Sequence, residues 1–224
     1  MDFLVYNWCM PRRNPPLVQN EIYHIFNRGV EKRNIFSGEG GYKHFLETLE
    51  HYRVKTPVKH SKKTLLKARG AVGLPEVEIL CYCLMPNHFH LLLRQISNNG
   101  TATFIGRIAN SYTKYFNTKY ERVGPLFQGT FKAVRIETDD QLLHVSRYIH
   151  LNPLVSGLVD SLKKYLWSSH PEYINEVQNE GSQLKINTEK ILSYFHSKKN
   201  YENFVLNQAD YGRSLEELKY HKLD

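Results

Sequence analysis

Two neighbouring stretches near the middle of the chain, 77–84 and 88–94, are rich in apolar residues. Short apolar runs bounded by turn residues are typical of buried β-strands. Pro86 and Asn87 lie between the two runs, and both residue types favour turns. The pattern therefore predicts a β-hairpin.

The second strand of this hairpin carries two histidines at alternating positions. Because side chains alternate across a strand, His88 and His90 point to one face. Phe89, Leu91 and Leu93 point to the other face, where we expect the hydrophobic core. Two imidazoles side by side on a rigid strand can supply two ligands of a metal site. The simpler alternative is that they are an ordinary pair of half-exposed histidines on a sheet.

Other periodic segments extend the pattern on both sides of the hairpin. They predict strands at 21–28 and 130–137, and helices at 42–53, from Gly100 to before Gly124, and at 141–152. Thr101 and Thr138 suit the starts of the second and third helices. Pro153 should end the third, because proline disfavours helical geometry in the residue before it.

The order of these elements, β-α-β-β-α-β-α, predicts an α+β fold of the ferredoxin-like (split βαβ, RRM-like) type. We expect one antiparallel sheet with helices on one face, forming a main domain at 17–180. The remaining expected parts are a flexible basic N-terminal arm at 1–16, a basic loop inserted at 56–76, and a small helical C-terminal extension at 181–224. Short helices are predicted at 162–167, 188–195, 201–206 and 215–219.

The composition favours a nucleic-acid partner and a reducing compartment. The 224 residues carry a formal net charge of +8 and include 15 tyrosines and 11 phenylalanines, which suits a polyanion with bases to stack on. No apolar run reaches the length of a membrane span, and residues 1–9 lack a signal-peptide pattern. Three cysteines indicate no disulfide framework, so we expect a cytoplasmic protein.

A second group of polar residues lies at the end of the helix predicted at 141–152. Tyr148 and Asn152 are spaced i, i+4 and so share one helical face. Their phenol and amide oxygens can both approach a metal held by His88 and His90, and this donor set suits Mg²⁺ or Mn²⁺ bound to a phosphate oxygen. A nearby cation favours the phenolate, so Tyr148 is a candidate nucleophile. In the alternative interpretation, Tyr148 is an ordinary helix residue and Asn152 is a C-terminal cap.

A structural zinc site is another interpretation of the hairpin. Cys81 and Cys83 share one face of the first strand. If the register pairs Cys83 with His88, both cysteines and both histidines share a face and can hold zinc. A register shifted by one residue turns Tyr82 and Leu84 to that face instead.

Four segments carry a family resemblance, in the order YHIFNRG at 23–29, CLMPNHFHLL at 83–92, GPLFQGTFK at 124–132 and RYIHLNP at 147–153. Together they resemble the HUH single-tyrosine transposases, most closely the REP-associated tyrosine transposases of bacteria. The resemblance covers roughly residues 11–175. It implies that 17–180 is an HUH catalytic domain, that His88, His90 and Asn152 hold Mg²⁺ or Mn²⁺, and that Tyr148 is the nucleophile.

The activity implied by the resemblance is metal-dependent nicking and strand transfer of single-stranded DNA through a covalent 5′-phosphotyrosine intermediate. The expected partner is single-stranded or hairpin DNA from palindromic repeats, bound by a monomer or a homodimer. Candidate DNA-binding residues are Gln128, Lys132, Arg135 and Arg147. The rival tyrosines Tyr112, Tyr115 and Tyr120 lack an amide four residues later followed by proline. The alternative function is a domesticated nucleic-acid-binding protein with the same fold and no catalysis.

Overall fold

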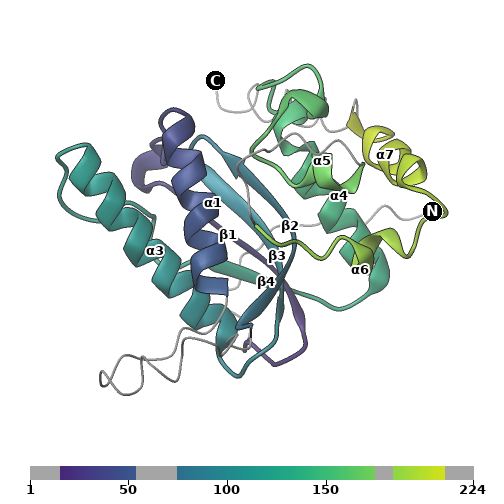
Figure 1. Cartoon of the computed structure of the whole chain (residues 1–224), viewed down its shortest axis with the longest axis horizontal. Helices are drawn as coiled ribbons and strands as arrows, with labels where there is room; N and C mark the ends of the chain where they lie inside the picture. Colours follow the sequence, from purple (N-terminus) through teal and green to yellow (C-terminus); the bar gives the residue numbers. More distant parts are fainter. Residues whose placement is uncertain (1–15, 54–74, 175–183, 210–224) are drawn as a thin grey trace, which may run out of the picture.

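A four-stranded antiparallel sheet forms the centre of the computed structural model, which describes residues 16–53, 75–174 and 184–209 (Figure 1). The strands are β1 (Ile22–Arg28), β2 (Val77–Met85), β3 (His88–Gln95) and β4 (Lys132–Ile136), and their spatial order is β2-β3-β1-β4. Each matches a predicted strand. The order and the antiparallel pairing confirm the α+β, ferredoxin-like fold.

The predicted hairpin is β2 and β3, joined by a turn at Pro86 and Asn87. Its register pairs Met85 with His88 and Cys83 with His90. The odd-numbered residues of β3 that were expected in the core all lie there, namely Phe89, Leu91 and Leu93.

Helices cover both faces of the sheet, with α1 and α3 on one side and α4 on the other (Figure 1). Helices α1 (Glu39–Arg53) and α3 (Gly100–Lys119) share a core with Leu84 and Leu91, as expected. Helix α4 (Asp139–Val155) packs on the opposite face, against Cys83 and Leu92. The expectation that all helices lie on one face fails for α4, because β2 also presents Leu80, Cys81, Cys83 and Met85 on its second face, and this apolar surface needs a cover.

The ends of two helices differ from the sequence-based expectation. Thr138 caps α4 as expected, since its Oγ1 accepts from the backbone N–H of Gln141 at 3.2 Å. Pro153 does not end α4, which continues to Val155 and is capped by Ser156, whose backbone N–H donates to the carbonyl oxygen of Asn152 at 3.0 Å.

Helix α3 begins without Thr101 as its cap. The N-cap is Asn99, and Thr101 is buried inside the first turn. Its backbone N–H donates to the side-chain oxygen of Gln95 at 3.1 Å, so a strand residue satisfies one of the donors that a cap would otherwise satisfy.

Short helices after α4 cover the same face of the sheet. They are the 3₁₀ turn η2 (Leu162–Lys164), α5 (His170–Tyr173), α6 (Glu189–Leu192) and α7 (Lys198–Leu206); a further 3₁₀ turn, η1 (Val30–Lys32), follows β1. His150 of α4 joins two of these segments, with Nδ1 2.7 Å from Tyr201 Oη and Nε2 2.8 Å from Ser169 Oγ. The described part of the extension therefore shares a buried polar network with α4.

Several predicted segments fall largely outside the described residues. These are the N-terminal arm, the basic loop at 56–76, the boundary at 181 and the helix at 215–219. Within the described ranges, every helix is too short or too polar to cross a membrane.

Gly29 allows the chain to turn tightly at the end of β1. A Cβ there would lie 2.2 Å from the carbonyl oxygen of Arg33 and 2.9 Å from a side-chain carbon of Ile35. We expect Gly29→Ala to lower the free energy of unfolding, measured by urea denaturation, by about 1–3 kcal/mol. Gly106, exposed within α3 with open space around it, is the control. Gly106→Ala should raise stability by up to about 1 kcal/mol, and equal effects of the two substitutions would contradict the steric argument.

Candidate active site

Three histidines gather on the face of the sheet that α4 covers. In the register of β1 and β3, His90 lies opposite Phe26 and His88 lies opposite Arg28, so these side chains share one face. His24 alternates onto the same face two residues before Phe26. Its Nε2 lies 2.9 Å from Nδ1 of His90, and the two ring planes are inclined by 26° with centroids 5.1 Å apart.

His24 was not predicted from the sequence as a site residue. It lies within the segment 23–29 that carried the family resemblance. Strand alternation alone gives it the same face as Phe26, but only the pairing of β1 with β3 shows that this face carries His90. The missing information was therefore the register of two strands far apart in the sequence.

Tyr148 of α4 lies over the histidine pair. Its ring meets His90 and His24 edge-on, with centroid separations of 5.4 and 6.0 Å. The neighbouring Ile149 and Leu151 are buried in the core between α4 and the sheet and hold the helix there. The Tyr148 side chain is nevertheless 44% exposed, so its phenol is accessible to a substrate.

Asn152 lies one helical turn after Tyr148, as the spacing predicted. Its amide nitrogen donates to the carbonyl oxygen of Tyr148 at 3.2 Å. The amide oxygen is then the side-chain atom suited to coordinate a hard cation. The interpretation of Asn152 as the C-terminal cap is wrong, since Ser156 occupies that position.

The rival tyrosines of α3 lie on the other side of the sheet. Tyr112 is buried and donates to the carbonyl oxygen of Ile35 at 2.8 Å. The hydroxyl of Tyr120 donates to the carbonyl oxygen of Ser37 at 3.1 Å, and Tyr115 contacts α1 through Gly40. These three phenols are therefore separated from the histidines by the sheet.

Two of the four candidate DNA-binding residues lie near the histidines. Gln128 precedes β4 and lies beside the end of β1, where its backbone N–H donates to the carbonyl oxygen of Arg28 at 2.8 Å and its side-chain oxygen accepts from the Arg28 guanidinium. Lys132 is exposed and pairs with Phe26, which in turn pairs with His90. Lys132 thus lies on the histidine face.

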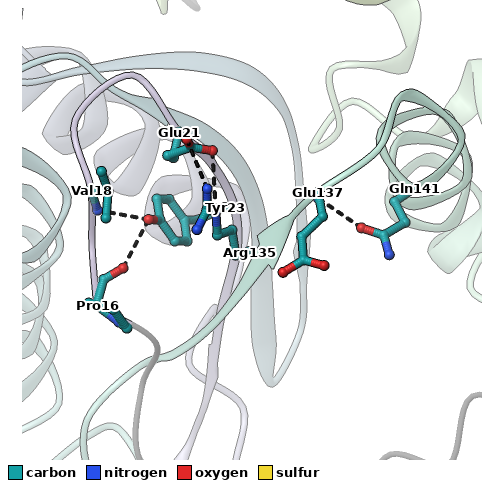
Figure 2. A network of polar contacts seen from close by, with 7 residues as sticks. All are labelled: Pro16, Val18, Glu21, Tyr23, Arg135, Glu137 and Gln141. Atoms are coloured by element: carbon teal, nitrogen blue, oxygen red, sulfur yellow. Dashed lines mark hydrogen bonds and ion pairs between the residues drawn. The ribbon is translucent and has the colours of Figure 1, made fainter.

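The other two candidates are directed elsewhere. Arg135 pairs with Tyr23 in the β-ladder, so its side chain lies on the opposite face, and an ion pair of 2.9 Å joins it to Glu21 (Figure 2). Arg147 is largely buried, with its guanidinium 4.4 Å from the ring centre of Phe204 in α7. Neither is placed beside Tyr148 and the histidines.

The zinc interpretation is not supported. The register differs from the one it assumed, although Cys81 and Cys83 do share the histidine face. Burial among apolar side chains raises the pKa of both thiols, whereas zinc binds the thiolate. Within the part of the chain that the structure describes, no three or more His, Cys, Asp or Glu side chains are arranged to hold a metal ion.

The mixed set of two imidazoles and an amide oxygen fits a divalent cation better. Nε2 of His90 is buried and has no hydrogen-bond partner among the described residues, while Nδ1 faces His24. His88 is held in a similar way, with Nδ1 2.6 Å from the amide oxygen of Asn87. Burial lowers the pKa of His24 to about 3 and that of His90 well below its usual value, so both rings are neutral, the form in which imidazole binds metals.

A hollow of about 830 Å³ lies along the β2 edge of the sheet, lined in part by Val77, Glu78 and Arg94. Two of its cations are in ion pairs, Arg94 with Glu78 at 2.8 Å and Arg53 with Glu50 at 2.7 Å. None of the site histidines lines this hollow, so it is separate from the candidate active site.

Comparison with solved structures identifies the class of fold. The chain is similar to a structure described as "Structure of the REP associates tyrosine transposase bound to a REP hairpin", with a TM-score of 0.53 and 12% sequence identity. The similarity covers 80% of this chain and all of that one. At this identity the similarity establishes the fold alone, which this chain shares with that transposase.

The family follows from the sequence itself. The family model described as "Transposase IS200 like" matches residues 18–152, more than half of the chain, and the chain belongs to this transposase family. The matched segment includes His24, His88, His90, Tyr148 and Asn152. No curated relative matches the chain. A member of a transposase family is a DNA-processing enzyme, which agrees with the activity expected from the sequence.

Proposed function

We propose that this protein nicks and joins single-stranded DNA through Tyr148, with a divalent cation held by His88, His90 and Asn152. The main support is the position of an accessible phenol directly over a buried histidine pair. The family match adds that the chain acts on DNA.

In the proposed reaction, the Tyr148 oxygen attacks the phosphorus of a DNA phosphodiester and its proton passes to solvent. The bond to the 3′ oxygen breaks, which leaves a 5′-phosphotyrosine and a free 3′-OH. When bound, Mg²⁺ or Mn²⁺ supplies Lewis-acid polarisation of the phosphate. Because the phosphotyrosine keeps the ester bond, a second 3′-OH can displace Tyr148 and join two strands.

The proposed substrate is hairpin or repeat-derived DNA. The structural neighbour is described as bound to a REP hairpin, which supports a similar substrate class here. Around the site, Lys132 offers a cation for the DNA backbone, and the Arg28–Gln128 pair offers polar groups beside His88. Phosphate contacts of this kind position a strand without reading its sequence.

Covalent trapping tests the proposal. The full chain is mixed with single-stranded hairpin DNA from its own genomic flanks, labelled at either end, in Mg²⁺, Mn²⁺ or EDTA, and run on a denaturing gel. We expect a metal-dependent protein–DNA band that carries the 3′ label, because the 5′ phosphate of the downstream fragment is attached to tyrosine. A covalent band that carries the 5′ label would show that tyrosine is attached to the 3′ end of the upstream fragment, which would contradict the proposed 5′-phosphotyrosine. Tight binding without any band would instead favour the non-catalytic nucleic-acid-binding protein.

The different positions of Lys132 and Arg135 give a further prediction. Lys132→Ala should remove one phosphate contact, so the slope of log affinity against log salt should fall by about 0.7 for single-stranded DNA. Arg135→Ala removes the same charge from the opposite face and should leave the slope unchanged. Filter binding at several salt concentrations measures both, and equal slopes for the two variants would show that Lys132 makes no specific contact.

A further inference from the structure

The contact between His24 and His90 lies in the interior, where the two side chains are 3% and 4% exposed. A hydrogen bond between two neutral imidazoles contains one proton, so one ring donates and the other accepts. If His24 donates, His90 carries its own proton on Nε2 and cannot bind a cation there. If His90 donates from Nδ1, its Nε2 presents a lone pair.

The surroundings of His90 favour the second arrangement. Nε2 of His90 is buried and has no acceptor among the described residues, so a proton on this atom would be a buried unsatisfied donor, at a cost of about 1–3 kcal/mol. A lone pair on the same atom is satisfied as soon as a cation binds. The His24 ring is held in place beside His90 by contact with Phe26, whose ring centre is 5.0 Å away.

We infer that His24 is a positioning residue that accepts the Nδ1 proton of His90 and so directs the Nε2 lone pair of His90 toward a divalent cation. This inference rests on the proposed function, because it assigns His24 a role in the metal site of that function. The contact of His88 with Asn87 parallels it, since the amide oxygen of Asn87 can accept only from a protonated Nδ1. Partners that hold the second nitrogen of a ligating histidine fix its tautomer and its orientation.

The test distinguishes the effect of losing the hydrogen-bond acceptor from the effect of changing the side-chain volume. His24→Gln keeps an acceptor on a side chain of similar reach, whereas His24→Leu removes the acceptor. Both are made in the full chain with Tyr148→Phe, so that single-stranded hairpin DNA can be present without cleavage. Mn²⁺ affinity is measured from the electron paramagnetic resonance signal of the free ion. We expect His24→Leu to weaken Mn²⁺ binding by about 10–100-fold and His24→Gln to stay within a few-fold of the parent.

A tautomer measurement on the unmodified protein provides a second readout that does not depend on the folding of the His24 variants. In ¹⁵N-histidine-labelled, metal-free protein, His90 should show the Nδ1–H tautomer, with its signals identified by their loss in His90→Gln. An Nε2–H tautomer for His90 would overturn the inference. So would unchanged Mn²⁺ affinity in His24→Leu.

His88→Ala, measured in parallel, distinguishes failure of the inference from failure of the proposed function. If the parent binds Mn²⁺ and His88→Ala does not, the metal site stands, and the His24 variants decide the inference alone. If the parent and His88→Ala bind Mn²⁺ equally weakly, the metal site of the proposed function fails, and the role of His24 fails with it.

Discussion

Tyr148→Phe is expected to reduce formation of the covalent protein–DNA product by about 10⁴-fold or more, because it removes the attacking oxygen and leaves the ring in place. The substitution keeps the ring and its edge-on contacts with His24 and His90, so hairpin DNA should bind with nearly unchanged affinity. Covalent trapping measures the first quantity, and filter binding measures the second.

Tyr120→Phe is the matched control for this prediction. Tyr120 is exposed to a similar degree, 37% against 44% for Tyr148, but lies beyond the sheet from the histidines. Removal of the Tyr120 hydroxyl should leave the amount of covalent product at the level of the unmodified protein. A band that survives Tyr148→Phe and disappears in Tyr120→Phe would move the nucleophile to α3.

The second large effect is expected from the histidines of β3. His88→Ala removes a proposed ligand from a half-buried position, and we expect the rate of DNA nicking to fall by at least about 10²-fold at saturating DNA. His90→Ala should have the same effect on nicking and also lower stability, because it leaves the buried His24 without its partner. Single-turnover nicking assays across a Mn²⁺ titration, with thermal unfolding alongside, measure both consequences.

An equivalent histidine outside the site controls for the loss of an imidazole. His51 is exposed on α1, which covers the other face of the sheet, and His51→Ala should nick DNA at the rate of the unmodified protein. Full activity in His88→Ala would contradict the proposed metal site. Asn152→Ala should lower activity in the same direction as His88→Ala if its amide oxygen is the third ligand.

The sequence was most informative where the periodicity of a single strand or helix decides which side chains share a face. The alternation in 88–94 predicted both the histidine face and the core face of β3. The i, i+4 spacing placed Tyr148 and Asn152 together on α4. The alternation of side chains also explains why Arg135 does not lie on the histidine face with Lys132. Lys132 and Arg135 are three residues apart on one strand, so they cannot share a face.

The sequence was least informative where two distant segments meet. The partnership of His24 with His90 depends on the register of β1 against β3, and no local pattern encodes that register. The placement of Arg147 depends on Phe204, which comes from a helix near the end of the described chain. The position of α4 on the second face follows mainly from the apolar residues that β2 presents there, a property of the sheet and not of α4 itself.

The buried network around His150 shows that the folded unit extends beyond the segment that the family model matches. The family match ends at Asn152, yet the imidazole of His150 is satisfied by Tyr201 and Ser169, which follow it. A fragment ending at residue 152 would hold every proposed reacting side chain but would expose the apolar surface of the helix that carries Tyr148. The segments after Asn152 therefore contribute to the placement of Tyr148 without adding a side chain to the candidate active site.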